Sequence, residues 1–485
     1  MRTHSKRLLL LLLPCIILAL DGRADNTTSG FNVLFIAVDD LNNDLGCYGH
    51  SIVKSPNVDR LAAKGVRFDK AYCQYPLCNP SRSSFLTGLR PEATRIHDNE
   101  TNPQPYYKDY TPLTEYLHQH GYYTAASGKI AHNTFPESLN WDFYENPTHD
   151  TKSFKTEPGG RTDETEPDGK IAETVVRLLK ENKEKRFFIA AGFRKPHGPL
   201  ECPKKYFDMY PPGSIPPLNE PPEHVKNIPK AAINPKQLKP DSREKVVTAY
   251  YACISFMDAQ LGLIMDAMDQ LKLWDNTVVV FFSDHGWHLG EHGGMYRKST
   301  LFEHVVRVPL IMVTPQSSRG ATAQGIVELV DLFPTLTELC GIPPPSKLEG
   351  TSFASLLSHP GQPWKKAAFT TLLREEMNHT MGRSVRTDHY RYTEWNDEKT
   401  AELYDYQADP NEYVNLVGSV KHTQVLEEMK AMLRAGWQAA VPHTAQQREK
   451  VEFKTHSRLF GRSSQEHMKS MIEDAFCEDE PIASH

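Results

Sequence analysis

Short, uninterrupted runs of apolar residues recur along this chain, and each run is bounded by polar or turn-forming residues. The runs cover residues 32–38, 123–127, 187–191, 277–282 and 308–313. Continuous apolar runs of this length are typical of strands that are buried on both faces, as in a parallel sheet. The predicted strands therefore belong to one large sheet whose two faces are both covered.

Segments with helical periodicity lie between the apolar runs. The clearest segment covers residues 244–271, where Val247, Ile254 and Met257 fall on or near one face. Strands that alternate with helices predict an α/β domain built on a mostly parallel sheet. Residues 136–169 are rich in Pro, Asp, Glu, Thr and Gly, and they are predicted to form a long surface loop. Further helices are predicted within residues 55–68, 114–119, 170–181 and 330–341.

The pattern changes after about residue 360. Residues 384–395 and 401–406 form shorter segments with more polar and apolar alternation, which predicts a small antiparallel sheet. A helix over residues 423–440 is expected to pack on this sheet. The chain is therefore expected to divide into a large domain over residues 25–360 and a smaller C-terminal subdomain over residues 361–485.

The N-terminus has the pattern of a secretory signal peptide. Lys6 and Arg7 precede an apolar run from Leu8 to Leu20. A run of this length is too short to span a bilayer, which needs about 20 residues. Cleavage after Ala24 would remove residues 1–24, and an N-terminal anchor is the alternative. We expect a secreted, periplasmic or lysosome-like location without stable membrane insertion.

Charge and cysteine content exclude several classes of function. The formal net charge is −6, and removal of residues 1–24 takes away four basic residues and one acidic residue, which leaves −9. An acidic protein is a poor general binder of nucleic acid, so no nucleic-acid partner is expected. An anionic substrate must then meet basic residues within a local pocket. The eight cysteines include no CxxC pair, which argues against a zinc–thiolate site, and their spacing assigns no disulfide.

Acidic and imidazole side chains directly follow two of the predicted strands. Asp39 and Asp40 follow the first strand, and Asp284 and His285 follow the strand that ends near Phe282. In open α/β sheets, ligands bind outside the carboxyl ends of the strands. Carboxylates in this number suit Ca²⁺ or Mg²⁺ better than zinc, and the longer ligand set favours Ca²⁺. A solvated turn is the alternative for Asp39 and Asp40.

Basic residues and histidines follow other predicted strands. Lys129 and His132 follow one strand, His197 follows the next, and Lys298 lies beyond Asp284. These side chains can bind anions or transfer protons. Each of them alone is more often an ordinary surface or core residue. Their joint occurrence in loops at the sheet end favours one common site.

A cysteine lies at a predicted helix start in the segment Cys78-Asn79-Pro80-Ser81-Arg82. Pro80 suits the first helical turn, and Gly88 is a natural C-terminal stop. Cys78 is therefore expected just before the helix N-terminus, where the helix dipole favours negative charge. A buried structural cysteine is the alternative for a single cysteine.

Cys78-x-Pro80-x-Arg82, followed by Ser83-Ser84-Phe85-Leu86-Thr87-Gly88, resembles the signature of the type I sulfatases, whose cysteine is oxidised after synthesis to formylglycine. Further blocks that look like sulfatase blocks, in the expected order, cover residues 32–40, 45–49, 128–132, 195–197, 283–292 and 308–310. The resemblance implies an alkaline-phosphatase-like fold. Such a fold has a large mixed, mostly parallel sheet flanked by helices, and a smaller C-terminal α+β subdomain on an antiparallel sheet.

The resemblance also implies a cofactor site and roles for the other residues. One Ca²⁺ ion would be bound by Asp39, Asp40, Asp284, His285 and the formylglycine derived from Cys78. The remaining implied roles are Arg82 holding the formylglycine, Lys129 and Lys298 binding sulfate oxygens, His132 assisting the formylglycine, and His197 facing the leaving oxygen.

Two assignments stay open on the sequence alone. The span from His292 to Lys298 is one residue longer than the common pattern, so Arg297 is a rival for the role of Lys298. A uronate carboxylate in the substrate would need a further cation, for which Arg194, Lys195 and Arg297 are the candidates.

The implied activity is that of a sulfuric ester hydrolase. A hydrated formylglycine offers two hydroxyls on one carbon: one attacks sulfur to form a sulfo-enzyme, and the other expels sulfate as the aldehyde forms again. The implied partners are a sulfated saccharide substrate and a formylglycine-generating or equivalent maturation enzyme.

A narrower resemblance concerns the substrate. Residues 195–197, 284–287 and 382–387 resemble the iduronate-2-sulfatase subgroup, which implies a uronate-containing glycan. The alternatives are a sulfatase for another ester, such as choline sulfate or an algal polysaccharide, a phosphohydrolase on the same superfold, and a catalytically silent glycan-binding relative.

Overall fold

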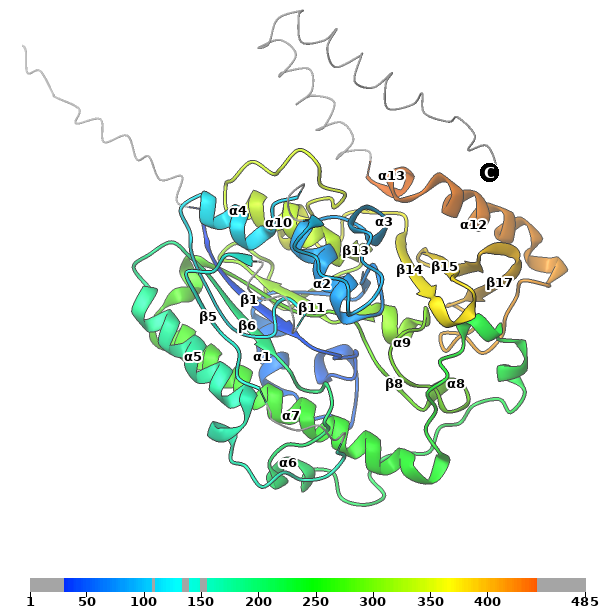
Figure 1. The fold of residues 1–485 in the computed structure, drawn as a ribbon, viewed down its shortest axis with the longest axis horizontal. Helices are drawn as coiled ribbons and strands as arrows, with labels where there is room; N and C mark the ends of the chain where they lie inside the picture. The colour runs from blue at the N-terminus through cyan, green and yellow to red at the C-terminus, as the bar shows by residue number, and fades with distance from the viewer. Residues whose placement is uncertain (1–29, 107–109, 133–138, 149–154, 443–485) are drawn as a thin grey trace, which may run out of the picture.

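A computed structural model describes residues 30–106, 110–132, 139–148 and 155–442 of the chain. The predicted signal peptide and the last residues of the predicted C-terminal subdomain lie outside this part. The described residues form a large layered domain with a small sheet on one side (Figure 1).

The centre of the fold is an eight-stranded sheet with the order β12-β2-β11-β7-β1-β6-β4-β5 among the described residues. The central strand β1 pairs in parallel with both β6 and β7, and Val38 at its end lies opposite Phe193 and Ser283. The carboxyl ends of these strands therefore meet at one edge of the sheet. The bounds are β1 (Asn32–Val38), β2 (Val66–Phe68), β4 (Tyr123–Gly128), β5 (Phe143–Glu145), β6 (Phe187–Phe193), β7 (Thr277–Ser283), β11 (Leu310–Val313) and β12 (Ala321–Ala323).

Helices cover both faces of this sheet because every second side chain of a strand points to the same face. Val33, Phe35 and Ala37 of β1 pack with one set of helices, and Leu34 and Ile36 pack with the other set. The first set is α2 (Cys78–Thr87), α4 (Leu113–Gln119) and α10 (Leu332–Leu339), and the second is α1 (Pro56–Lys64), α5 (Pro167–Asn182) and α7 (Pro240–Gln270).

Helix α7 is long and apolar enough to cross a membrane by length and composition alone. Within the fold, 83% of its most apolar window is buried. Figure 1 shows α7 running beside α5 along one side of the large domain. This burial explains its apolar character as that of a core helix.

The small C-terminal sheet is antiparallel, as predicted, and packs against the large domain. Its order is β14-β15-β16-β17. The amide of Thr371 donates to the carbonyl of Gln74 over 3.0 Å, and the amide of Leu373 donates to the hydroxyl of Tyr75 over 2.9 Å. The bounds are β14 (Ala368–Arg374), β15 (Thr380–Arg386), β16 (Tyr390–Trp395), β17 (Asp397–Asp405), α12 (Thr423–Ala435) and α13 (Trp437–Ala440).

The predicted fold class is confirmed, but several element boundaries were wrong. The predicted helix over residues 423–440 is broken at Gly436, whose φ of +73° ends α12. The predicted strand over residues 308–313 is divided by Pro309, which has no amide hydrogen to donate to a strand. The predicted surface loop over residues 136–169 contributes the edge strand β5.

The remaining strands and α-helices of the described residues are short. They are β3 (Ala71–Tyr72), α3 (Pro91–Thr94), α6 (Lys204–Phe207), β8 (His288–Leu289), α8 (Glu291–Gly294), β9 (Tyr296–Arg297), α9 (Glu303–Val306), β10 (Arg307–Val308), β13 (Val327–Glu328) and α11 (Ala354–Ser358).

Candidate active site

Three aspartates lie buried where β1 and β7 end. Asp39 and Asp40 follow β1, and Asp284 follows β7. The amide of Asp40 donates to Asp284 Oδ1 over 3.2 Å, and Asp40 adopts a positive φ of 64°. The parallel pairing of β1 with β7 therefore brings together two acidic pairs that are 244 residues apart in the sequence.

Cys78 is the first residue of α2, so the prediction that it precedes the helix was wrong by one position. Leu77 is the extended N-cap, and Gly88 ends the helix with a φ of 70°. The Cys78 sulfur lies 3.5 Å from Asp39 Oδ1 and 4.0 Å from Asp40 Oδ1. The helix start thus places the signature cysteine directly over the aspartates at the sheet edge.

The environment of Cys78 favours its charged form. Burial and the Asp39 carboxylate raise the pKa of the thiol, but the ammonium groups of Lys129 and Lys298 lower it, and their effect prevails. The net pKa lies below the ordinary value for a cysteine. A group that carries negative charge at this position is therefore stabilised by the two lysines.

Arg82 lies one helical turn after Cys78 and is almost fully buried. Its guanidinium donates to Asp284 Oδ2 over 2.8 Å and to Asp39 Oδ1 over 3.1 Å. It also donates to the carbonyls of Lys129 and Ile130. Burial lowers the pKa of Arg82, but Asp284 and Asp39 raise it well above its ordinary value. Arg82 thus ties α2 to the ends of three strands.

Lys129 reaches the site because two glycines allow β4 and β6 to approach closely. A Cβ at Gly128 would lie 2.2 Å from the carbonyl oxygen of Gly192. The Lys129 ammonium donates to Asp39 Oδ2 over 2.6 Å. Burial raises the pKa of Asp39, but Lys129 and then His197 and Arg82 lower it well below its ordinary value.

Lys298, and not its neighbour Arg297, reaches Cys78. The Lys298 ammonium lies 2.6 Å from Asp40 Oδ1 and 2.9 Å from Cys78 Sγ. The Arg297 guanidinium instead packs over the Tyr296 ring, 5.4 Å from its centroid. The preceding loop contains positive φ values at Gly293 and Gly294, and Arg297 itself has a φ of +74°.

The predicted histidines surround the same site at different depths. His285 Nε2 lies 3.5 Å from Asp40 Oδ1, and His197 Nε2 lies 3.9 Å from Asp40 Oδ2. His197 is the more accessible of the two, since 38% of its side chain is exposed. Burial and the nearby Lys129 lower the pKa of His132 to about 4, so His132 is neutral at physiological pH.

The donor set fits a divalent cation. Asp39, Asp40, Cys78 and His197 have ligand atoms within 4.8 Å of one another, and so do Cys78, Asp284 and His285. Asp40 Oδ2 and His285 Nε2 are buried without a hydrogen-bond partner in the described structure. A bound cation would satisfy both atoms, and the predominance of carboxylate oxygens suits Ca²⁺.

A proton competes with such a cation at His285. Burial lowers the pKa of His285, but the Asp284 carboxylate raises it to about 9. A protonated imidazole has no lone pair for a metal, so cation binding there would release a proton.

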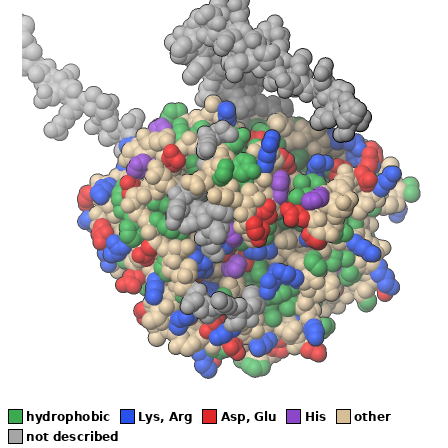
Figure 2. Space-filling view, viewed as in Figure 1, with side chains coloured by type: hydrophobic (Ala, Val, Ile, Leu, Met, Phe, Trp, Pro, Cys, Tyr) green, Lys and Arg blue, Asp and Glu red, His purple; other side chains and the backbone are tan. Residues whose placement is uncertain are grey.

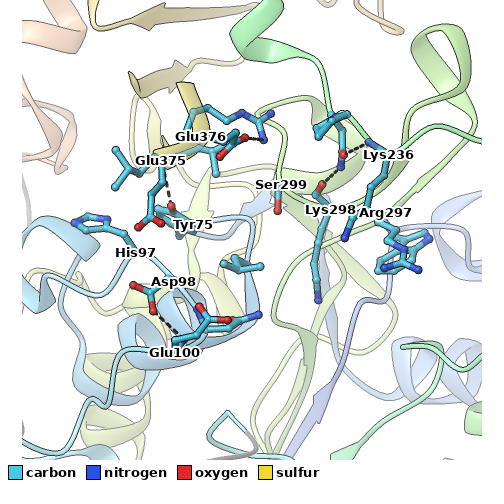
Figure 3. A pocket seen from close by; sticks show the side chains of 18 of the residues that line it. Tyr75, His97, Asp98, Glu100, Lys236, Arg297, Lys298, Ser299, Glu375 and Glu376 are labelled. Carbon is cyan, nitrogen blue, oxygen red and sulfur yellow. Dashed lines mark hydrogen bonds and ion pairs between the residues drawn. The ribbon is translucent and has the colours of Figure 1, made fainter. Parts of the chain in front are cut away.

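A pocket of about 450 Å³ opens beside this cluster and shares His197 and Lys298 with it (Figure 3). Figure 2 shows acidic, basic and histidine side chains gathered near the middle of the corresponding face. The charged residues that line the pocket are Asp98, Glu100, Lys236, Arg297, Lys298, Arg374, Glu375 and Glu376. Most of these were not predicted from the sequence because no recognisable motif contains them.

Only one of the three residues considered for a uronate carboxylate lines this pocket. Arg297 forms part of its wall, whereas Arg194 and Lys195 do not. The Arg194 side chain donates to the carbonyl of Pro147 and to Asn146 Oδ1. The Lys195 side chain is buried and donates to the carbonyl of Pro199.

Comparison with known proteins identifies the family. The sulfatase family model matches residues 31–342, which is more than half of the chain. The chain belongs to the sulfatase family. This sulfatase is therefore a sulfuric ester hydrolase. A model of the C-terminal region of N-sulphoglucosamine sulphohydrolase also matches residues 290–438.

Individual relatives cover most of this sulfatase. A sulfatase of Formosa agariphila is 34% identical, over 86% of this chain and 89% of the relative. The iduronate 2-sulfatase of Homo sapiens is 30% identical, over 82% of this chain and 92% of the relative. A structure solved in complex with D-glucosamine-2-N,6-O-disulfate has a TM-score of 0.71 at 22% identity, over 84% of this chain and 97% of that one, which shows a shared fold.

Proposed function

We propose that this sulfatase removes sulfate from a sulfated, uronic-acid-containing sugar, and that Cys78 acts as formylglycine in the working enzyme. The convergence of Lys129 and Lys298 with the aspartates on Cys78 carries the proposal. This arrangement provides cations for a sulfate group at the one residue that matches the oxidised position of the signature. The likeness to an iduronate 2-sulfatase supports the choice of substrate.

The lysines bind and orient the sulfate in this proposal. Each ammonium group donates hydrogen bonds and has a carboxylate beside it, Asp39 for Lys129 and Asp40 for Lys298. Charge-assisted hydrogen bonds to the sulfate oxygens would stabilise the charge that builds up during transfer. Arg82 connects the three strand ends with the start of α2.

The histidines handle protons. His197 Nδ1 lies 2.7 Å from the carbonyl of Gly198, which directs Nε2 towards the site. His197 also lines the pocket, so it can protonate the departing sugar oxygen as a general acid. His132, which is neutral at physiological pH, can accept a hydrogen bond or a proton from the hydroxyl groups at position 78.

Two groups outside the encoded chain complete the proposed site. Formylglycine, made from Cys78 by a maturation enzyme, would supply a hydrated aldehyde as nucleophile and as internal exit for sulfate. Ca²⁺, held by Asp39, Asp40, Asp284 and His285, would supply positive charge beside that nucleophile.

Sulfate release by protein matured with a formylglycine-generating enzyme tests the proposal. The substrates are a 2-O-sulfated uronate disaccharide, an aryl sulfate and choline sulfate, and mass spectrometry of the Cys78 peptide reports the oxidation. We expect release from the uronate ester, and complete loss of release in Cys78→Ala but not in the control Cys47→Ser. Unchanged release by Cys78→Ala would refute the proposal.

Choline sulfate is the second candidate substrate because one side of the pocket is acidic. Asp98, Glu100, Glu375 and Glu376 could attract its quaternary ammonium group. This candidate leaves the pocket cations Lys236 and Arg297 without a role. A preference for choline sulfate over the uronate ester would favour it.

A further inference from the structure

The charges of the pocket are separated onto two sides, except that Arg374 lies 4.0 Å from Glu376 on the acidic side. Figure 3 shows Lys236, Arg297 and Lys298 on one side, and Asp98 and Glu100 across the pocket from them. Glu375 and Glu376 also lie away from the three basic residues. A substrate that carries charge therefore meets a different potential on each side.

Asn234 fixes the geometry of the basic side. Its side-chain amide donates to the carbonyls of Tyr296 and Lys298, and its Oδ1 accepts the amide of Lys236 over 2.8 Å. The amide of Tyr296 also donates to the carbonyl of Lys236 over 3.0 Å. Asn234 is buried, so two loops more than 50 residues apart are held together beneath their cationic side chains.

The three basic side chains repel one another. Partial burial lowers the pKa of Lys236, and the charges of Arg297 and Lys298 lower it further. Lys298 faces Asp40 and Cys78 at the sulfate position. Lys236 and Arg297 lie farther out on the pocket wall, where an anionic ligand would relieve the repulsion.

The opposite side cannot receive an anion equally well. Asp98 there accepts hydrogen bonds from Thr101 and from the amide of Glu100. Glu376 lies 4.0 Å from Arg374, so its charge is only loosely paired. Repulsion from these carboxylates leaves one favourable orientation for a sugar that bears two anionic groups.

We propose that Lys236 and Arg297 form a second anion subsite that binds a carboxylate or a second sulfate of the same substrate while Lys298 binds the sulfate to be removed. This inference rests on the proposed function and deepens it. The subsite makes the enzyme select sugars with two anionic groups over esters with one.

Paired substrates test the subsite directly. The first pair is a 2-O-sulfated uronate disaccharide and its carboxyl-reduced analogue, and the second pair is a disulfated and a monosulfated hexosamine. Lys236→Gln and Arg297→Gln are compared with Lys180→Gln, which removes an exposed lysine of α5. For the doubly anionic member of at least one pair, we expect KM to rise about tenfold, or ~1.4 kcal/mol, with kcat nearly unchanged.

The pattern across substrates identifies the second anion. A rise in KM confined to the uronate indicates a carboxylate, and a rise confined to the disulfated hexosamine indicates a second sulfate. The singly anionic members and the control Lys180→Gln should change less than about twofold, and Lys236→Arg should restore KM because it restores the charge.

Two outcomes would overturn the subsite. One is an equal rise in KM for both members of each pair, and the other is no rise in either variant. Hydrolysis of the aryl sulfate separates these outcomes from failure of the proposed function. Wild-type protein with oxidised Cys78 that hydrolyses none of the esters refutes the function itself, whereas normal hydrolysis without discrimination refutes only the subsite.

Discussion

The Lys298 ammonium lies 2.9 Å from the Cys78 sulfur and 2.6 Å from Asp40 Oδ1. Its neighbour Arg297 lies on the pocket wall and packs over Tyr296. Under the proposed function, these adjacent cations would face different parts of the substrate, Lys298 at the sulfate and Arg297 beyond it.

This difference predicts separable kinetic effects. Lys298→Met should lower kcat by about 10²–10³-fold, because it removes a preorganised cation from the developing charge on the sulfate. Arg297→Gln should raise KM instead and leave kcat within about twofold. Steady-state kinetics on the uronate ester measure both, with the Cys78 oxidation state checked in each variant. A larger loss of kcat in Arg297→Gln than in Lys298→Met would show that Arg297, and not Lys298, acts at the sulfate.

A second prediction concerns stability. Arg82→Met should lower the free energy of unfolding by about 3–5 kcal/mol, because Asp39 and Asp284 would remain buried without their shared partner. Arg177→Met is the matched control, since it breaks an exposed pair with Glu181 and should cost less than about 1 kcal/mol. Urea unfolding measures both variants. Equal losses of unfolding free energy in the two variants would mean that Arg82 contributes no more to stability than an exposed ion pair does.

Much of this site could be predicted because the strands and the cysteine signature are each recognisable from a short contiguous stretch of sequence. The apolar run of β1 predicts where Asp39 emerges, and the pattern of β7 does the same for Asp284. Parallel pairing then brings both to one edge of the sheet. The start of α2 was misplaced by one residue, since Leu77 and not Cys78 is the N-cap.

Other features depend on contacts that no local pattern contains. Counting residues left Lys298 and Arg297 as rivals, because the direction of each side chain, with Lys298 at Cys78 and Arg297 over Tyr296, depends on the folded loop. The pocket wall joins Lys236 to Glu375 from segments about 140 residues apart, and only the fold brings them together. The edge strand β5 lies in a polar stretch whose composition indicates a loop.

Acid sensitivity is a third prediction, and it arises from a buried histidine on the loop that leads to Lys298. His292 is 1% exposed, and its ring stacks on Phe302 at 4.2 Å between centroids. Burial holds the pKa of His292 well below its ordinary value, and the charges of His288, His304 and His224 lower it further. The Glu291 carboxylate opposes this shift but does not reverse it.

The direction of the pH effect follows from this lowered pKa. The unfolded chain binds a proton at His292 below about pH 6.5, whereas the folded protein does not, so stability is lost as the pH falls below that value. His292→Phe should flatten this loss, and His359→Phe, at an exposed site, should not. Melting temperatures between pH 4.5 and 7.5 test this. A His292→Phe curve parallel to wild type would assign the acid sensitivity to other groups.

The last prediction concerns the metal. Removal of divalent cations with a chelator should lower activity and stability together, because Asp40 Oδ2 and His285 Nε2 are buried without a hydrogen-bond partner in the described structure. Ca²⁺ at 100 times its Kd should restore about 2.7 kcal/mol of stability, and Mg²⁺ should restore less since the donor set suits a larger ion. Asp40→Asn should abolish this Ca²⁺-dependent gain, whereas Asp266→Asn, in an exposed pair with Arg60, should retain it. Activity could also be lost through contamination or misfolding. The deciding measurement is therefore the Ca²⁺-dependent gain in stability, measured by calorimetry. An equal Ca²⁺-dependent gain in stability in Asp40→Asn would show that the cation binds elsewhere. The buried Asp40 carboxylate would then not be explained by cation binding.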